Sequence, residues 1–142
     1  MRYLISTRGR YALRVMIDLA NHPEGYLPLK EISERQDISL KYLESIMPGL
    51  KEAGFVSGTH GKGGGYKLAR PVGSYTVGEI LRVAEGTIAP VACLEDDYRC
   101  ERAETCPTLS TWKKLDAIIN DYIDTVKLVD LMFMPNMVKV DF

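Results

Sequence analysis

The segment of residues 60–65, His-Gly-Lys-Gly-Gly-Gly, constrains the fold of this chain more than any other stretch. It lies between two short strand-like runs, residues 55–59 and 66–69, and its glycines permit a tight turn. The sequence therefore predicts a β-hairpin with a flexible, cationic tip. A phosphate-cradling loop is excluded, because that motif needs a helix after the loop and a Gly-Lys-Ser/Thr triplet.

Two predicted helices come first in the chain. In residues 7–21 apolar side chains recur at helical spacing on one face, formed by Ala12, Val15, Met16 and Leu19. The turn chemistry of residues 21–25 ends this helix. Residues 28–36 predict a short second helix, with Pro28 in its first turn and Leu29 and Ile32 facing inward. Asp37 and Ile38 then form a tight connection.

Residues 39–53 predict a third helix, with Ser39 as its N-cap and Gly54 at the C-cap position. Its buried face consists of Leu43, Ile46, Met47 and Leu50. Pro48 and Gly49 interrupt its middle, so we expect a kink or an early end there. Three helices followed by a hairpin, in this order, are the winged helix-turn-helix arrangement.

Beyond the hairpin the sequence predicts two more helices, separated by a loop. Thr76 and Glu79 form a capping box for a helix that stops at Gly86. Residues 87–106 form the loop, and Pro107 suits the first turn of a last helix, which runs to about residue 132. The predicted fold is mainly α with a small β-hairpin wing, divided into a DNA-binding domain (1–86), a cysteine-containing sensor loop (87–106) and a dimerisation helix with its tail (107–142).

The last predicted helix carries an apolar heptad stripe. Its members step by 3, 4, 3, 4, 3 and 4 residues: Trp112, Leu115, Ile119, Tyr122, Val126, Val129 and Phe133. Ile118 and Ile123 widen this stripe. A helix packed on its own domain needs the same pattern, but the length of the stripe and its Trp and Tyr favour a homodimer interface. A two-fold dimer would set two recognition helices about 34 Å apart on a pseudo-palindromic operator.

Charge is divided unevenly along the chain. Residues 1–70 hold 11 Lys+Arg and 7 Asp+Glu, whereas residues 71–142 hold 7 and 12. A basic first half indicates that this half faces an anionic partner, here double-stranded DNA. The outward positions near the start of the third helix are Ser39, Lys41, Tyr42, Glu44 and Ser45. Further candidate contacts are His60 and Lys62 at the hairpin tip and, as phosphate clamps, Arg8, Arg10 and Arg14.

Glu44 has two interpretations that the sequence leaves open. Its carboxylate can accept a hydrogen bond from cytosine N4 and so contribute selectivity. Alternatively, it is solvated on the flank of the helix, because phosphates repel a carboxylate that finds no donor.

The cysteines, Cys93, Cys100 and Cys106, cluster in the 87–106 loop. Their spacing lacks the Cys-x2-Cys knuckle of most zinc sites and suits an iron–sulfur cluster that takes a fourth ligand from elsewhere. Three reduced or redox-active thiols explain the residues equally well. The odd number of cysteines argues against a disulfide framework, and no signal peptide or membrane span is visible, so we expect a cytoplasmic protein.

The sequence resembles the Rrf-two family of bacterial winged-helix regulators over nearly the whole chain. The resemblance rests on Ser6-Thr7-Arg8-Gly9-Arg10-Tyr11-Ala12, Ile32-Ser33-Glu34-Arg35-Gln36, Ile38-Ser39-Leu40, Tyr42-Leu43-Glu44, Gly61-Lys62-Gly63-Gly64-Gly65-Tyr66 and the three cysteines. It implies a homodimer that represses or activates promoters. It also implies that Cys93, Cys100 and Cys106 hold an iron–sulfur cluster, and that Ser39, Lys41, Tyr42, Glu44 and His60 fall on DNA-contacting positions.

Two departures from the family pattern concern the fourth cluster ligand. Some relatives use a histidine three residues after the last cysteine, where this chain has Leu109. Others use a carboxylate at the start of the first helix, and residues 6–9 contain none. The fourth ligand is therefore unassigned, and Glu101, Glu104, another local carboxylate and a small thiol are candidates. The loop is also acidic, which opposes binding of an anionic cluster unless one carboxylate is a ligand.

The function predicted from the sequence is a homodimeric transcription regulator, a repressor, controlled by an iron–sulfur cluster or by thiol redox state. The alternative is a cysteine-metabolism-type regulator, without a cluster, that is controlled by binding a partner enzyme. An enzyme built on the thiols is disfavoured, because His22 and His60 lie in turns far from the cysteines in sequence. A third interpretation is a protein-interaction module that docks a metabolic enzyme through the acidic loop and the C-terminal tail.

Overall fold

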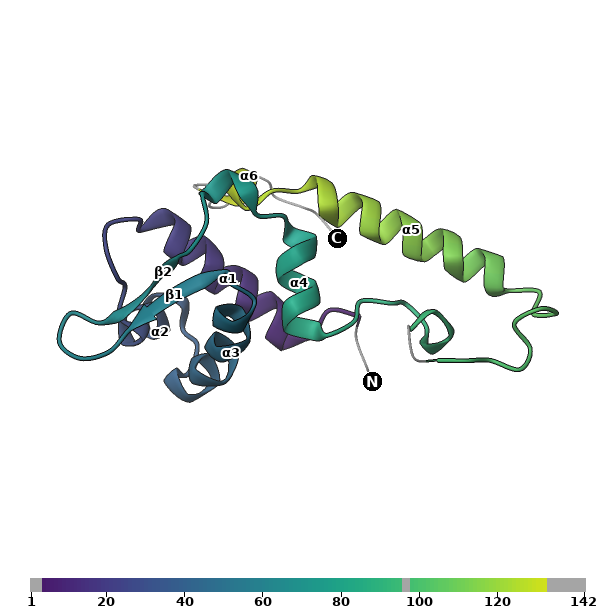
Figure 1. Cartoon of the computed structure of the whole chain (residues 1–142), viewed down its shortest axis with the longest axis horizontal. Helices are drawn as coiled ribbons and strands as arrows, with labels where there is room; N and C mark the ends of the chain where they lie inside the picture. Colours follow the sequence, from purple (N-terminus) through teal and green to yellow (C-terminus); the bar gives the residue numbers. More distant parts are fainter. Residues whose placement is uncertain (1–3, 96–97, 133–142) are drawn as a thin grey trace.

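The computed structural model describes residues 4–95 and 98–132. These residues form a winged helix-turn-helix unit with a projecting arm, which is the helix of residues 109–125 (Figure 1). The elements follow the predicted order, beginning with helix α1 (Thr7–Asn21), α2 (Leu29–Gln36) and α3 (Leu40–Glu52). Strands β1 (Val56–Thr59) and β2 (Gly65–Leu68) form the wing. After the turn η1 (Val72–Ser74) come α4 (Val77–Glu85), the turn η2 (Ala92–Leu94), α5 (Leu109–Thr125) and α6 (Leu128–Leu131).

The helix caps predicted at Ser39, at Thr76 with Glu79, and at Gly86 are present, whereas Ala53 rather than Gly54 is the C-cap of α3. The Ser39 hydroxyl accepts a hydrogen bond from the backbone N–H of Tyr42 at 3.1 Å, which fixes the start of α3. Thr76 and Glu79 form the reciprocal capping box of α4, and Gly86 ends that helix. Asp37, between α2 and α3, adopts a left-handed conformation with φ 53°, which makes the tight turn of the helix-turn-helix.

The core is formed by the apolar faces predicted for the first three helices. Val15, Met16, Leu43 and Met47 are fully buried, together with Ile32 of α2. Later segments contribute to the same cluster: the Tyr75 ring is fully buried, and its hydroxyl donates to the Phe55 carbonyl at 2.7 Å. Burial of this kind stabilises by about 1.5–3 kcal/mol per large apolar side chain.

An early end of α3 at Pro48 is not found, because the helix continues to Glu52. Proline lacks the N–H that would bond the carbonyl four residues earlier, which belongs to Glu44. Both residues are exposed, so this carbonyl lies on the solvent side of the helix. The core contacts of Met47 and Leu50 on the opposite side hold the helix together.

The wing pairs in an antiparallel register, with Val56 opposite Leu68 and Thr59 opposite Gly65. Leu27 adds a further bridge, since its N–H donates to the Tyr66 carbonyl at 2.8 Å and its carbonyl accepts from the Tyr66 N–H at 2.9 Å. A Cβ atom on Gly65 would collide with the Leu27 carbonyl. Glycine at this position therefore permits the close approach of the two backbones.

The last helix is shorter than predicted. α5 ends at Thr125, and the chain is extended at Val126 and Lys127 before α6. The N–H of Val77 donates to the Val126 carbonyl at 2.8 Å, and the N–H of Leu128 donates to the Tyr75 carbonyl at 3.1 Å. This backbone pairing replaces the helical hydrogen bonds and interrupts the predicted heptad stripe. Phe133, its last member, lies outside the described residues.

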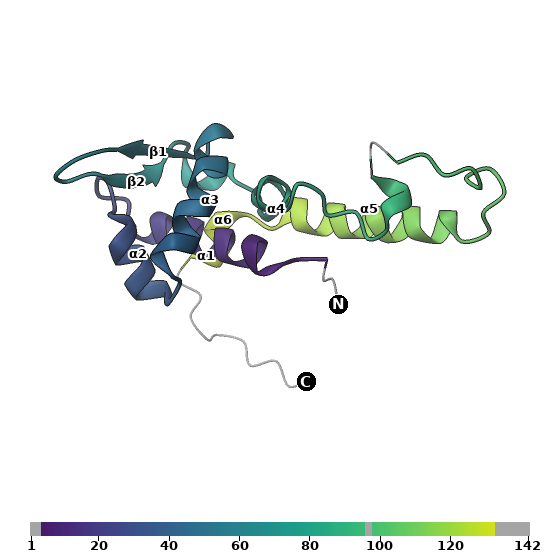
Figure 2. The same cartoon turned by 90° about the horizontal axis from the view of Figure 1, so that it is seen from below.

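The arm is held to the winged-helix unit by α4, which lies between them in both views (Figures 1 and 2). Ile119, Ile123 and Val126 pack against Val77 and Leu81 of α4 in a second small core. Arg82 donates to both carboxylate oxygens of Asp124, at 2.8 and 2.9 Å, and to the Asn120 side chain. No residue of α5 is itself buried, so the arm presents much of its surface to solvent.

Candidate DNA interface and cysteine site

The first turns of α3 form an exposed surface. Lys41, Glu44 and Ser45 are exposed, as is Leu40 at the start of the helix. Two of the predicted polar readers are already engaged: the Ser39 hydroxyl caps α3, and the Ser45 hydroxyl donates to the Tyr42 carbonyl at 2.6 Å. The Tyr42 ring packs edge-on against Tyr11 of α1, with centroids 5.4 Å apart. The contact between the Tyr11 and Tyr42 rings therefore fixes the position of this surface relative to α1.

The arginines of α1 have three different surroundings. Arg8 crosses to α3 and donates to the Ser45 carbonyl at 2.8 Å. Arg10 is exposed and donates to the Thr7 hydroxyl at 3.1 Å. Arg14 lies over the Tyr11 ring and donates to both the side chain and the backbone carbonyl of Gln36. Arg14 thus has a packing role between α1 and the helix-turn-helix, beyond the phosphate contact predicted for it.

The wing tip keeps its two predicted DNA-contacting side chains at the surface. His60 and Lys62 are exposed, and Gly61 and Gly63 adopt positive φ angles of 87° and 80° between and beside them. Such angles suit glycine and permit a close approach of the backbone to another molecule. Lys67 on β2 lies 4.7 Å from the centroid of the Tyr26 ring.

Sequence reasoning missed an ion pair between α1 and α2, in which a buried carboxylate meets a partly exposed arginine. Asp18 of α1 is only 4% exposed, and its two carboxylate oxygens accept hydrogen bonds from Arg35 at 3.1 and 3.0 Å. Gln36 donates a third bond at 3.1 Å. The Asp18 carboxylate raises the pKa of Arg35 through this hydrogen bond, against the opposing effect of burial. A carboxylate beside the apolar stripe of α1 was the available signal.

The three cysteines line one hollow of about 370 Å³ at the N-terminal end of α5. Its other lining residues are Tyr98, Arg99, Ala103, Leu109 and Lys113. The charged residues among them, Arg99 and Lys113, are both cationic. The acidic side chains of the loop therefore do not line the hollow that contains the thiols. Glu101 and Glu104, the candidate fourth ligands, are not part of this lining among the residues the structure describes.

Cys106 is the thiol with the most distinct surroundings. Its sulfur lies 3.3 Å from the Thr108 hydroxyl. Hydrogen bonds from the Thr108 side chain and backbone, followed by smaller effects of Leu109 and Arg102, lower the pKa of Cys106 below that of an ordinary thiol. Hydrogen bonds to the charged form favour the thiolate, which is the form that binds metals and reacts with oxidants.

The donor set fits an iron–sulfur cluster in its type, three thiols that line one hollow. Three thiols facing one hollow, with Arg99 and Lys113 beside them, suit a group that is anionic and larger than a single ion. Among residues 4–95 and 98–132, no three Cys, His, Asp or Glu side chains are close enough to hold one metal ion. A fourth ligand for a cluster would have to come from outside this lining.

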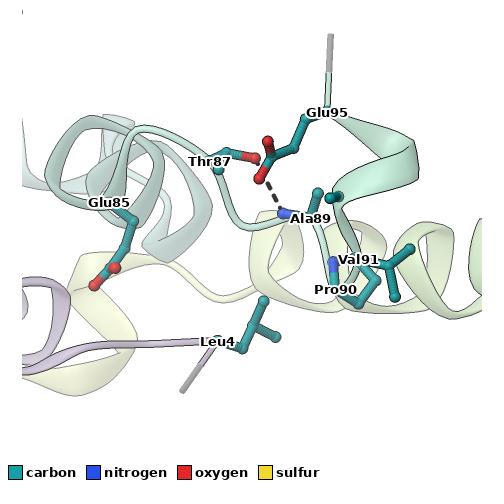
Figure 3. Close-up of a pocket in the computed structure, with 8 residues that line it drawn as sticks. Leu4, Glu85, Thr87, Ala89, Pro90, Val91 and Glu95 are labelled. Atoms are coloured by element: carbon teal, nitrogen blue, oxygen red, sulfur yellow. Dashed lines mark hydrogen bonds between the residues drawn. The ribbon is translucent and has the colours of Figure 1, made fainter. Parts of the chain in front are cut away.

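A second hollow of about 320 Å³ lies between Leu4 and the start of the loop (Figure 3). Its lining includes Glu85 and Glu95 but no cysteine. Glu85 is already engaged, because its carboxylate accepts hydrogen bonds from Ser6 N–H, Ser6 hydroxyl and Gly9 N–H at 2.7–2.9 Å. This carboxylate stabilises the N-terminus of α1.

The fold and the exposed recognition surface together define a winged helix-turn-helix DNA-binding regulator. A family model described as "Iron-dependent Transcriptional regulator" (Rrf2) matches residues 5–133, and the chain therefore belongs to the Rrf2 family, which was predicted from the sequence. Members of this family regulate transcription and are not enzymes. No helix in the described part of the chain is long and apolar enough to cross a membrane.

Named relatives agree with this assignment. The chain is 36% identical over 129 residues to the protein rrf2 of Nitratidesulfovibrio vulgaris, covering 90% of this chain and 86% of that protein. It is also 36% identical over 129 residues to the HTH-type transcriptional regulator IscR of Xenorhabdus nematophila, with coverages of 90% and 78%.

Solved structures show the same fold. CymR, the global cysteine regulator of B. subtilis, is 37% identical with a TM-score of 0.73, and the match covers 92% of this chain and 96% of that chain. IscR of T. potens is 33% identical with a TM-score of 0.74, and the match covers 99% and 94%. The fold class predicted from the sequence is thus confirmed.

Proposed function

We propose that this regulator binds a pseudo-palindromic operator as a homodimer, as a repressor in the bacterial cytoplasm, and that the cysteine site controls its affinity. The DNA contacts would come from the exposed start of α3, the wing tip and the start of α1: Ser39, Lys41, Tyr42, Glu44, His60, Lys62, Arg8 and Arg10. Support for this surface comes from its exposure and from the excess of positive charge in residues 1–70.

The dimer interface would lie on the arm. Leu115, Ile118 and Tyr122 form an apolar strip along α5, and Tyr122 is 67% exposed. Trp112 is half-buried at the start of this helix, and Val129 is exposed on α6. Ile119 and Val126, by contrast, already pack on α4 within the protomer. An exposed apolar strip of this kind supports association, because water is released when a second copy covers it.

The observation that supports the control of affinity is that Cys93, Cys100 and Cys106 line one hollow formed by the cysteine loop and the first residues of α5. An iron–sulfur cluster held by these thiolates would supply a redox-sensitive group there. Arg99 and Lys113 would offset its negative charge, and Thr108 would keep the Cys106 sulfur deprotonated. A bound cluster stabilises the loop conformation that binds it more tightly. This change in the loop shifts the arm.

The test combines spectroscopy with DNA footprinting. The protein is purified and reconstituted with iron and sulfide anaerobically, its visible absorption and iron content are measured, and promoter fragments from the source genome are footprinted with each form. We expect a coloured dimer that protects two half-sites about 34 Å apart. A variant with all three cysteines changed to alanine should be colourless and should differ in affinity from the reconstituted protein. Equal affinities, or a colourless wild type, would refute control by a cluster.

A second candidate is control by a partner enzyme, in a cysteine-metabolism-type regulator without a cluster. The likeness to CymR, named the global cysteine regulator, favours it. The acidic side chains of the loop that lie outside the cysteine hollow, among them Glu101 and Glu104, offer a surface for such a partner. In that case the cysteine-free variant would bind DNA with wild-type affinity. Addition of the enzymes of cysteine synthesis, one at a time, would change that affinity.

A further inference from the structure

Leu40 is an apolar residue on an otherwise polar surface. It is the first residue of α3, directly after the N-cap Ser39, and it is 40% exposed. Across residues 5–95, all of which the structure describes, it is the one large apolar side chain exposed to this degree. The other exposed large apolar residues lie at the N-terminal end, in the cysteine loop, on α5 or on α6.

Helix geometry places Leu40 within the recognition surface. Residues four positions apart lie one above the other on a helix, so Leu40 shares a face with Glu44 and is adjacent to Lys41. Both of these are exposed, and within the described part of the chain their side chains have no hydrogen-bond partner. The buried residues Leu43 and Met47 point toward the core instead. Leu40 thus stands beside the two charged side chains that remain free to meet DNA.

The chemistry of leucine restricts what it can recognise in a base. Its side chain has no hydrogen-bond donor or acceptor, so it gains only from contact with another apolar group. In the major groove, the 5-methyl group of thymine is the one apolar group among the four standard bases. Covering that methyl group removes water from both partners, and bases without it leave the leucine in contact with polar edges.

We propose that Leu40 is a specificity-determining residue that contacts the 5-methyl group of one thymine in each half-site of the operator. This inference rests on the proposed role of α3 as the recognition helix. It assigns to the apolar side chain a selectivity that Ser39 and Ser45 supply less readily, because their hydroxyls already serve the backbone of α3.

The experiment compares thymine with deoxyuracil, which lacks only the methyl group. A preferred duplex is first selected from a random-sequence library with the wild-type protein. Each thymine is then replaced by deoxyuracil, symmetrically in both half-sites, and the Kd is measured by fluorescence anisotropy at fixed salt. For the wild type we expect one position at which replacement weakens binding by about fourfold per half-site, which corresponds to about 0.8 kcal/mol for one buried methyl-sized group.

The variants separate this contact from a general loss of binding. Leu40→Ala should bind the thymine duplex more weakly and should be insensitive to deoxyuracil at that position. Leu4→Ala removes an equally exposed leucine outside α3 and should keep the wild-type sensitivity. Lys41→Ala should weaken binding to both duplexes by the same factor, because a phosphate contact does not distinguish them.

The outcomes distinguish the two levels of the argument. If the wild type enriches a duplex but no deoxyuracil position matters, or if Leu40→Ala remains as sensitive as the wild type, the role of Leu40 is refuted and DNA binding stands. If the wild type enriches no sequence, the proposed operator recognition fails, and the role of Leu40 fails with it.

Discussion

The winged-helix unit and the arm differ in how completely each satisfies its own apolar surface. The first four helices and the wing surround a core in which the large side chains are almost wholly buried. α5 has no buried residue, and three of its large apolar side chains are exposed. Apolar residues nevertheless recur at helical spacing in the sequence of both regions.

The difference shows that periodicity alone does not tell which partner an apolar stripe packs against. In α1 and α3 the stripe is covered by the same chain. In α5 one edge of the stripe, Ile119 and Ile123, packs on α4, and the other edge, Leu115, Ile118 and Tyr122, has no cover within the described residues. We infer that the second edge is reserved for a second copy.

A charge placed on the uncovered edge should have the largest effect. Ile118→Glu is expected to yield a monomer, since burying a carboxylate in an apolar interface is costly. Affinity for an operator with two half-sites should then fall about a thousandfold, because the two winged-helix units are no longer linked in one dimer. Analytical ultracentrifugation and anisotropy titrations measure the two effects.

The matched control for this substitution is Ala117→Glu, which places the same charge on an exposed position away from the strip. It should remain dimeric and bind DNA as the wild type does. A dimeric Ile118→Glu protein with normal affinity would contradict the assignment of this edge to the interface.

Neighbouring residues of α6 should show the same contrast within one turn. Leu128 is fully buried in the main core, whereas Val129 is 40% exposed. We expect Leu128→Ala to lower the free energy of unfolding by about 3 kcal/mol, through lost transfer energy and a cavity. Val129→Ala should change it by less than about 0.5 kcal/mol in a dissociated protomer. Urea denaturation of the Ile118→Glu background measures both, and equal effects would show that α6 is not part of the core.

The cysteines should differ in reactivity in a pH-dependent way. Hydrogen bonds from Thr108 lower the pKa of Cys106, so its thiolate is present at a lower pH than that of an ordinary thiol. In the metal-free protein, iodoacetamide should alkylate Cys106 before Cys93 near neutral pH. Thr108→Val should move the rate profile of Cys106 to higher pH, as followed by mass spectrometry of the labelled peptides. An unchanged profile would mean that the hydroxyl does not act on the sulfur.

The ion pair between α4 and α5 should have the smallest effect. Arg82 holds the pKa of Asp124 below its ordinary value through their hydrogen bond. Both side chains are partly exposed, so Asp124→Asn should cost only about 0.5 kcal/mol at pH 7. A depressed pKa in the folded state gives stability that is present above the unfolded value and is lost as the pH falls through the folded value. Urea denaturation should therefore show the two proteins converging in acid.

Local signals in the sequence were sufficient for the winged-helix unit. Ser39, the Thr76–Glu79 pair and Gly86 mark helix ends through contacts with residues two to four positions away. The spacing of Val15, Met16 and Leu19 specifies a buried face because the helix period is fixed. The hairpin followed from the glycine segment, although each strand is displaced by one residue from its predicted start or end.

Features that depend on distant partners were not predicted. The heptad pattern passes through Val126 without interruption, yet the backbone there pairs with the segment that precedes α4. The pairing of Asp18 with Arg35 and Gln36 needs the relative placement of α1 and α2. The cysteines were found by type and spacing, but the side of the loop on which the cations gather follows from its fold.

The return of the chain at residues 126–128 has a consequence for how such regulators diversify. Leu128 is buried in the core of the winged-helix unit. The extended residues around it pair with the backbone of residues 75–77, between the wing and α4. The winged-helix unit is therefore completed by residues 126–131, which follow the arm in sequence. An exchange of residues 87–125 between homologous chains would therefore have to keep two junctions, one before residue 87 and one before residue 126, because this segment is an insertion in the winged-helix unit rather than a detachable tail.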